Sequence, residues 1–278
     1  MGDAGAKDAT RALFDLVAPD YERTGVAFFE PIGRRLVELA GPRPGERVLD
    51  VGCGRGAVLF PAAAAVGPTG HVTGFDLAPA MVALVAQEVA ERGLTNVDVR
   101  VGDAEDPPVP ASSFDHVLAS LVLPFVPDVP RAITAVLEVL VPGGRFGFTT
   151  FGDGDARWEP LEALLVGAAG DADDPDERGS EEEEGPLASI YAIREILAAA
   201  GCVDLQIRDE PFRVVFETPE RWLAWFRSTS GTALLEAIPP ERRHDVVARA
   251  LALVDTLRGD DGSIGMGVAI RYTSARRP

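Results

Sequence analysis

The sequence predicts an α/β fold in which a mostly parallel sheet is covered by helices on both faces. Short apolar strands alternate with segments of helical spacing from about residue 46 onward, which is typical of βαβ units. The first strand ends in the glycine-rich segment Gly52-Cys53-Gly54-Arg55-Gly56. The 278 residues suffice for one large α/β domain with a sizeable insertion.

Apolar periodicity and turn residues predict the elements of the core, residues 46–151, in chain order. Expected strands lie at Arg47–Val51, His71–Asp76, Val97–Val101, Phe114–Ser120 and Gly144–Phe151. Expected helices lie at Ala57–Ala65, Ala80–Glu91 and Val129–Leu140.

Helical segments flank this core and are expected to cover its site. Residues 1–45 form a predicted N-terminal helical cap, because residues 10–40 have helical spacing up to the stop at Gly41-Pro42. Residues 152–200 are a predicted insertion after the fifth strand that supplies a helical cap, with helices at Trp158–Gly167 and Tyr191–Ala200. Its acidic loop, residues 171–185, is either solvated or a lid over the site.

Residues 201–278 are predicted to return to the core sheet and to add further cap helices. The expected strands lie at Val203–Arg208 and Ile264–Thr273, and the expected helices at Pro219–Ser228 and Ala233–Leu257.

Composition argues against several classes of protein. The formal net charge of −18 would repel a nucleic acid, and no apolar run reaches the roughly 18 residues that a membrane span needs. The N-terminus lacks the apolar stretch of a secretory signal, so we expect a cytoplasmic protein. Two cysteines and three histidines show no ligand spacing, so neither a disulfide framework nor a metal site is expected.

The glycine-rich segment predicts a cofactor site. Glycine lets the backbone turn with positive φ and lets main-chain N–H groups approach a ligand at the carboxyl end of a strand. The same glycines, with Asp76 at the end of the next strand, also fit the dinucleotide pattern G-x-G-x-x-G/A. These residues alone leave open both a nicotinamide dinucleotide and S-adenosylmethionine.

Three further features favour S-adenosylmethionine. Asp50 lies two residues before Gly52, where a carboxylate would repel a pyrophosphate but suits the ammonium and sulfonium groups of this cofactor. Asp103 follows the third strand and can accept a hydrogen bond from an adenine amino group. Leu77 and Met81 follow Asp76 and can pack on a purine ring.

With these features, residues from about Tyr21 to Phe151 resemble the class I S-adenosylmethionine-dependent methyltransferases. The resemblance is greatest to the branch of ubiquinone- and menaquinone-biosynthesis enzymes and related small-molecule methyltransferases. The matching motifs, in family order and spacing, are Val48–Gly56, Gly74–Met81, Gly102–Glu105, Phe114–Ser120 and Leu140–Gly144. The resemblance implies a Rossmann-like, seven-stranded sheet completed by the last two predicted strands.

The resemblance also implies roles for the residues of the first two motifs. Gly52, Gly54 and Gly56 would wrap the methionine part of the cofactor, with Asp50 close to its amino group. Asp76 would hold the ribose hydroxyls.

Residues of other segments would complete the cofactor site by the same resemblance. Leu77 and Met81 would flank adenine, and Asp103, with the Ala104 backbone beside it, would bind the adenine amino group. Ser120, after the fourth strand, would lie near the methionine part through its backbone, and Tyr21 from the N-terminal segment would close over the cofactor.

The chemistry that the resemblance implies needs no universal catalytic residue. S-adenosylmethionine carries an activated methyl group and a neutral leaving group, so the protein must align the acceptor and exclude water. The catalytic residues, the methylated element (O, N or C) and the oligomeric state are not readable from the motifs. His116 lies within the fourth strand, where a structural role is expected.

The acceptor is expected to be a small hydrophobic or aromatic molecule. Aromatic residues in the N-terminal segment, after the fourth strand and in the cap are candidates for its binding. They are Phe28, Phe29, Phe125, Trp158, Tyr191 and Trp222. Pro124 stands where this branch often has a histidine, which favours a specialised metabolite over a quinone precursor.

Two other enzyme classes stay open on the residues alone. Relatives on this fold include enzymes that keep the cofactor loop but catalyse cyclisation or another non-methylating step. An NAD-dependent oxidoreductase is also permitted by the glycine pattern.

Overall fold

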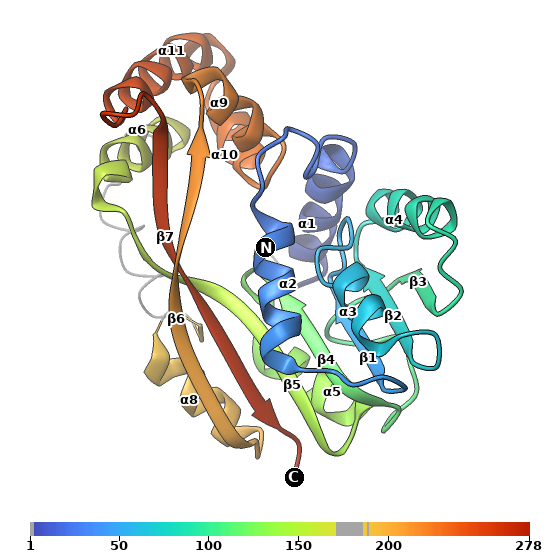
Figure 1. The fold of residues 1–278 in the computed structure, drawn as a ribbon. Helices are drawn as coiled ribbons and strands as arrows, with labels where there is room; N and C mark the ends of the chain where they lie inside the picture. The colour runs from blue at the N-terminus through green and yellow to red at the C-terminus, as the bar shows by residue number, and fades with distance from the viewer. Residues whose placement is uncertain (1–2, 171–185, 188) are drawn as a thin grey trace.

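A computed structural model describes residues 3–170, 186–187 and 189–278, which form one seven-stranded sheet flanked by helices (Figure 1). The strands are β1 (Arg47–Val51), β2 (His71–Asp76), β3 (Val97–Val101), β4 (Phe114–Ser120), β5 (Leu140–Gly154), β6 (Val203–Phe216) and β7 (Ile264–Arg276). Their order is β3-β2-β1-β4-β5-β7-β6. Only β7 runs antiparallel to its neighbours. The predicted fold class is confirmed.

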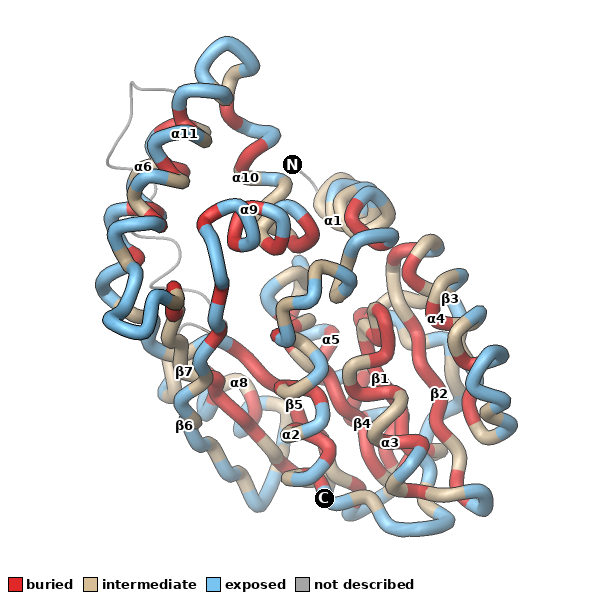
Figure 2. The backbone as a smooth tube through the Cα atoms, turned by 45° about the horizontal axis from the view of Figure 1, so that its top comes forward, coloured by how far each residue is buried: buried red, intermediate tan, exposed pale blue. Residues whose placement is uncertain are grey.

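Helices cover both faces of the sheet. The first face carries α2 (Phe29–Ala40), α3 (Leu59–Val66) and α4 (Pro79–Glu91), whose apolar residues share one core cluster. The opposite face carries α5 (Val129–Val139) and α8 (Ile190–Ala199) over a second cluster. The buried residues of β1, β4 and β5 lie in the middle of the molecule, as Figure 2 shows. The strand order reverses between β1 and β4, and ligands bind at such a switch point in open α/β sheets.

A group of helices at the far end of β6 and β7 forms the cap (Figure 1). Its members are α6 (Glu159–Ala169), α9 (Pro219–Arg227), α10 (Gly231–Ala237) and α11 (Pro240–Thr256). The cap therefore combines helices from before and after β6. The other helix of the predicted insertion, α8, packs on the sheet through Ile193 and Leu197. The acidic loop at 171–185 lies outside the described residues.

Several predicted boundaries were wrong, and prolines explain two of them. The expected helix over 10–40 is two helices, α1 (Asp3–Val17) and α2, because Pro19 and the left-handed backbone at Glu22 (φ 58°) interrupt it. The expected helix over 233–257 is α10 and α11, separated at Ile238-Pro239. Strands β5 and β6 extend well beyond the predicted ends. No helix in the described part of the chain is long and apolar enough to span a membrane.

Candidate functional site

The glycine-rich loop after β1 forms the floor of a cavity at the switch point. Gly52 and Gly54 line it with φ of 62° and 47°, a backbone conformation that residues with a side chain rarely adopt. A Cβ on Gly52 would lie 2.5 Å from Val122 Cγ2, so the close approach of the two loops requires glycine there. Gly56 does not line the cavity. A Cβ at Gly56 would collide with the Phe60 ring, so this glycine permits packing against α3.

Two carboxylates lie at the carboxyl ends of β1 and β2. Asp50 is 1% exposed, and its Oδ2 has no hydrogen-bond partner, while its carboxylate accepts a bond from the Leu59 N–H. Burial, and secondly the neighbouring Asp76 carboxylate, raises the pKa of Asp50 well above its usual range. Asp50 is therefore a buried carboxyl group two residues before Gly52, and it is not among the residues that line the cavity.

The Asp76 carboxylate lines the cavity and is held by backbone donors. Its Oδ2 accepts from the Gly54 N–H at 2.8 Å, and its Oδ1 accepts from the Ala78 N–H at 2.9 Å. Burial raises the pKa of Asp76, although these hydrogen bonds act in the opposite direction. Leu77 and Met81, which follow Asp76, also line the cavity.

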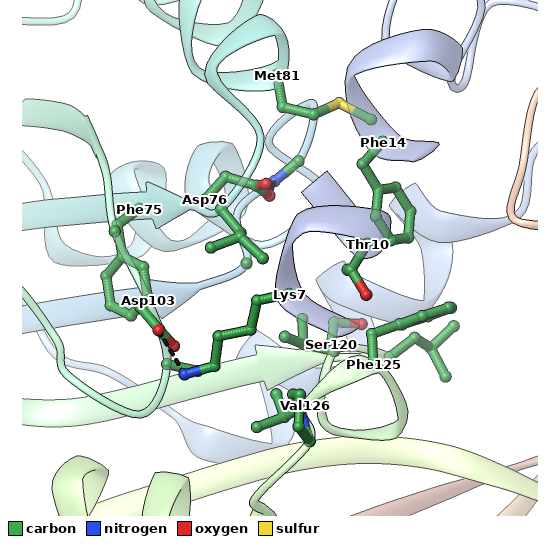
Figure 3. A pocket seen from close by; sticks show the side chains of 18 of the residues that line it. Lys7, Thr10, Phe14, Phe75, Asp76, Met81, Asp103, Ser120, Phe125 and Val126 are labelled. Carbon is green, nitrogen blue, oxygen red and sulfur yellow. Dashed lines mark hydrogen bonds and ion pairs between the residues drawn. The ribbon is translucent and has the colours of Figure 1, made fainter. Parts of the chain in front are cut away.

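The loop after β3 closes the far end of the cavity. Asp103 and Ala104 line this end, as predicted from the sequence. Asp103 Oδ1 accepts from the Glu105 N–H at 2.9 Å, and Oδ2 lies 2.7 Å from Lys7 Nζ, the ion pair drawn in Figure 3.

Helix α1, part of the predicted N-terminal cap, supplies one wall of the cavity through residues that were not predicted as site residues. Lys7, Thr10 and Phe14 line it, and their spacing places them on one helical face, as Figure 3 shows. Lys7, a single lysine near apolar residues at helical spacing, is the sequence feature that could have indicated this wall. The other lining residues outside the prediction are Phe75, Gly102, Leu121, Val122, Val126 and Pro127.

Tyr21 lies in the turn after α1 and lines the cavity, next to the glycine loop. Its ring stacks on Phe29 at a centroid distance of 4.5 Å and meets Phe14 edge-on at 6.3 Å. Burial, followed by the charges of Glu22 and Asp76, raises the pKa of Tyr21 well above its usual range. The phenol therefore stays protonated at neutral pH.

The segment after β4 forms the remaining side of the cavity. Ser120 lines it, and its Oγ lies 3.2 Å from Thr149 Oγ1. Leu121 adopts φ of 57° and donates its N–H to the same threonine hydroxyl at 3.0 Å. Phe125 lines the cavity beyond it and meets Phe14 edge-on at 5.0 Å. The cavity and its open mouth together hold about 710 Å³ of space that protein atoms do not fill.

The aromatic residues predicted to bind the acceptor lie in different parts of the molecule. Phe125 lines the cavity, and Phe29 lies behind Tyr21. Phe28 is 4% exposed in an aromatic cluster with rings from β5, β6 and α9. Trp158 and Trp222 are buried against each other in the cap, whereas Tyr191 is 81% exposed on α8. Contact of these residues with an acceptor stays a prediction.

The residues present fit S-adenosylmethionine. The orphaned, buried Asp50 oxygen below the glycine loop suits a ligand that brings a cation to this end of the cavity. The glycine backbone gives the close approach that a main-chain-bound ligand needs, and a Cβ at Gly52 would remove it. At the other end, the carboxylates of Asp76 and Asp103 offer acceptors to hydroxyl and amino groups. The lining between them is mostly apolar.

Comparisons with known proteins agree with this geometry. Residues 48–144 match the family model described as a methyltransferase domain. Nocamycin O-methyltransferase of Saccharothrix syringae is 39% identical over 95% of this chain and 97% of its own length. Aklanonic acid methyltransferase DauC of Streptomyces sp. (strain C5) is 48% identical over 54% of this chain and 68% of its own length.

A solved structure with the same fold shows that the fold alone does not determine the reaction. The crystal structure of the cyclase SpnF is 25% identical, with a TM-score of 0.54, over 88% of this chain and 80% of SpnF. The match to nocamycin O-methyltransferase over nearly the full length of both chains establishes the family. The cofactor is therefore S-adenosylmethionine rather than NAD. This chain belongs to the class I S-adenosylmethionine-dependent methyltransferases and acts on a small molecule.

Proposed function

We propose that this methyltransferase transfers the methyl group to an acidic oxygen, a carboxylate in the first instance, of a hydrophobic specialised metabolite. The names of two relatives support this choice, because one is an O-methyltransferase and the other acts on aklanonic acid. Both relatives are named for small organic molecules, which also suits the apolar lining of the cavity.

This proposal rests on one observation: among the described residues, no side chain that could act as a base lines the end of the cavity formed by β4 and the segment after it. Every titratable lining residue, namely Lys7, Tyr21, Asp76 and Asp103, comes from α1, the turn after it, β2 or the loop after β3. The lining residues from β4 and the segment after it carry no titratable side chain in the described structure. They are Ser120, Leu121, Val122, Phe125, Val126 and Pro127. The methionine end of the cofactor would face this segment.

None of the three histidines, all of which are described, lines the cavity. His71 and His116 lie in strands and pair with Asp98 at 2.9 Å and Glu46 at 3.0 Å, and His244 lies in α11 of the cap. A carboxylic acid ionises near pH 4 in water, so its oxygen is already a nucleophile at neutral pH and needs no base. A neutral alcohol would need a group to remove its proton, and an amine that is protonated at neutral pH would first have to lose a proton.

The cofactor would be held along the carboxyl edge of the sheet. The Gly52 and Gly54 backbone would bind its methionine part above Asp50, which would pair with the ammonium group. Asp76 would accept hydrogen bonds from the ribose hydroxyls, and Asp103 from the adenine amino group.

In the proposed reaction, a carboxylate oxygen of the acceptor forms a bond to the methyl carbon while the carbon–sulfur bond breaks in line. The bonding electron pair leaves with sulfur, and the products are a methyl ester and S-adenosylhomocysteine. The protein's contribution is to align the acceptor in an apolar site that excludes water.

The proposal is tested with aklanonic acid and with hydrophobic aromatic acids, alcohols and amines of matched size, using a methyl-labelled cofactor. We expect label in a product that mild alkali hydrolyses, as a methyl ester requires. Initial rates should change little between about pH 6 and 9, because the acid is ionised throughout. Label that survives hydrolysis on nitrogen or carbon, or a rate governed by a group titrating near neutrality, would contradict the proposal.

A non-methylating reaction in the same site is the second candidate, because the cyclase SpnF shares 25% identity with this chain. One measurement separates the two. Methylation releases one S-adenosylhomocysteine for each product, whereas cyclisation leaves the cofactor unchanged.

The cytoplasmic location and the lack of a nucleic-acid partner also stay predictions. They rest on the composition and the net charge of −18.

A further inference from the structure

We propose that Lys7 is a positioning residue for the cofactor: it holds α1 against the loop after β3 and orients the Asp103 carboxylate toward the adenine amino group. The inference rests on the proposed role of Asp103 and adds to it a residue from a distant part of the chain. Lys7 is the only lysine in the sequence.

The ammonium of Lys7 bridges two carboxylates. Lys7 Nζ lies 2.7 Å from Asp103 Oδ2 and 2.7 Å from Glu105 Oε2. The Glu105 side chain is 2% exposed, and among the described residues its only other cation is Arg131 at 3.8 Å. A carboxylate buried this far needs a close partner, so Lys7 compensates much of its charge.

Lys7 also determines how the Asp103 carboxylate is oriented. One carboxylate oxygen accepts from the Glu105 N–H, and the other accepts from Lys7. With both oxygens held, the carboxylate cannot rotate freely, and its remaining lone pairs keep one direction. Lys7 and Asp103 both line the cavity, where Figure 3 shows their ion pair, so this direction is set at the cavity wall.

The contact closes the N-terminal half of α1 over the cavity. The C-terminal half has its own attachments: Asp15 Oδ1 accepts from the Ala80 N–H at 2.8 Å, and Arg55 Nη1 donates to the Ala18 carbonyl at 3.0 Å. Among the described residues, Lys7 makes the only polar contacts, to Asp103 and Glu105, between the first two turns of α1 and the sheet side of the cavity. Loss of the ammonium should therefore free this end of α1.

The test compares two ligands that differ only at the adenine amino group, S-adenosylhomocysteine and its deaminated analogue S-inosylhomocysteine. Lys7→Met keeps the length of the side chain and removes its charge. We expect Lys7→Met to bind S-adenosylhomocysteine about 10- to 100-fold more weakly and to lose most of the wild-type preference for it over the analogue. Lys7→Arg should restore part of the preference, because it restores the charge. Calorimetry gives both dissociation constants.

Arg11→Met is the matched control, because Arg11 lies on the same helix and, within the described part of the chain, pairs only with the exposed Asp8. It should leave both dissociation constants unchanged. If Lys7→Met weakens both ligands equally, Lys7 only holds the helix and does not position Asp103, which overturns the proposal.

Asp103→Asn separates failure of this proposal from failure of the assignment beneath it. One outcome is that the wild type binds both ligands equally, with neither dissociation constant changed by Asp103→Asn. In that case Asp103 does not bind the amino group, and the proposed roles of Asp103 and Lys7 are both wrong. If Asp103→Asn loses the preference but Lys7→Met keeps it, only the role of Lys7 is wrong. Loss of the preference in both variants supports the proposal.

Discussion

At the scale of single residues, the site depends on where charge is buried. Asp50 and Asp76 lie near each other at the ends of adjacent strands, and burial is the largest cause of the raised pKa of each. Asp103 forms an ion pair with Lys7, which Lys7 shares with Glu105. A buried carboxyl without a cation therefore lies two residues before the glycine loop, and an ion-paired carboxylate lines the other end of the cavity. A ligand with an ammonium group at one end and a neutral adenine at the other matches this arrangement.

Asp50→Asn should change how stability depends on pH. In the unfolded chain Asp50 ionises near its ordinary pKa, whereas in the folded protein burial raises its pKa. The folded state then keeps the proton of Asp50 up to a higher pH than the unfolded chain does. The wild type therefore loses stability as pH rises from the unfolded pKa to the folded pKa. Asparagine removes this loss, and the variant should gain about 1.4 kcal/mol relative to wild type for each pH unit in that interval.

Urea denaturation of the ligand-free protein at several pH values between 4 and 9 measures this difference. Asp260→Asn is the control, because water solvates its exposed carboxylate in both states. A constant stability difference between Asp50→Asn and wild type across the range would show that Asp50 does not titrate differently on folding. Asp50→Asn should also weaken S-adenosylhomocysteine binding, because its ammonium partner is lost.

At the scale of elements, close backbone approach holds the helices at the site. Gly33 in α2 faces the glycine loop, where a Cβ would lie 2.5 Å from the Ala57 carbonyl oxygen. Local sequence patterns predicted α2 as helix but could not indicate this approach, because Ala57 lies 24 residues further along the chain. For the same reason, the face of α1 that lines the cavity was not predicted, although its helical spacing is visible in the sequence.

Gly33→Ala should destabilise the protein by about 1–3 kcal/mol, because the added methyl meets backbone that cannot move alone. Gly167→Ala is the matched control in another helix, α6, where nothing lies within 4 Å of the added Cβ. It should be neutral or stabilising by about 0.5–1 kcal/mol, since glycine is less favourable than alanine inside a helix. Chemical denaturation of both variants measures the changes. Equal effects of the two substitutions would mean that α2 can shift away from the loop.

At the scale of the whole molecule, an aromatic cluster joins the core to the cap. Phe28 lies just before α2 and contacts Phe151 of β5, Phe212 of β6 and Trp225 of α9 at centroid distances of 6.3, 5.7 and 5.2 Å. Cofactor cavity, N-terminal helices and cap therefore form one packed unit. Ligand binding at the cavity should consequently stabilise the molecule as a whole.

S-adenosylhomocysteine should raise the midpoint of thermal unfolding, and NAD should not. At a ligand concentration of 100 times Kd, mass action adds about 2.7 kcal/mol to the stability of the native state. For a chain of this size, that corresponds to roughly 5–10 °C. Differential scanning fluorimetry with each ligand makes the comparison. A shift with NAD and none with S-adenosylhomocysteine would contradict the cofactor assignment.

The sequence by itself determined the fold class, favoured S-adenosylmethionine as the cofactor and indicated most residues of the cavity floor. Gly52, Gly54, Asp76 and Asp103 were predictable because each follows a strand, and the carboxyl ends of parallel strands meet at one edge. These signals are local, with the turn residues and the carboxylates adjacent to the strands that position them.

Only the tertiary structure decided which distant segments complete the site. Lys7 meets Asp103 across 96 positions of the chain, and Phe125 meets Phe14 through the same closure of α1. Tyr191 and Trp222 have similar aromatic character in the sequence, yet one is exposed on α8 and the other is buried in the cap. Helical periodicity indicates that a face is apolar, but the element that covers this face depends on packing between segments far apart in the chain.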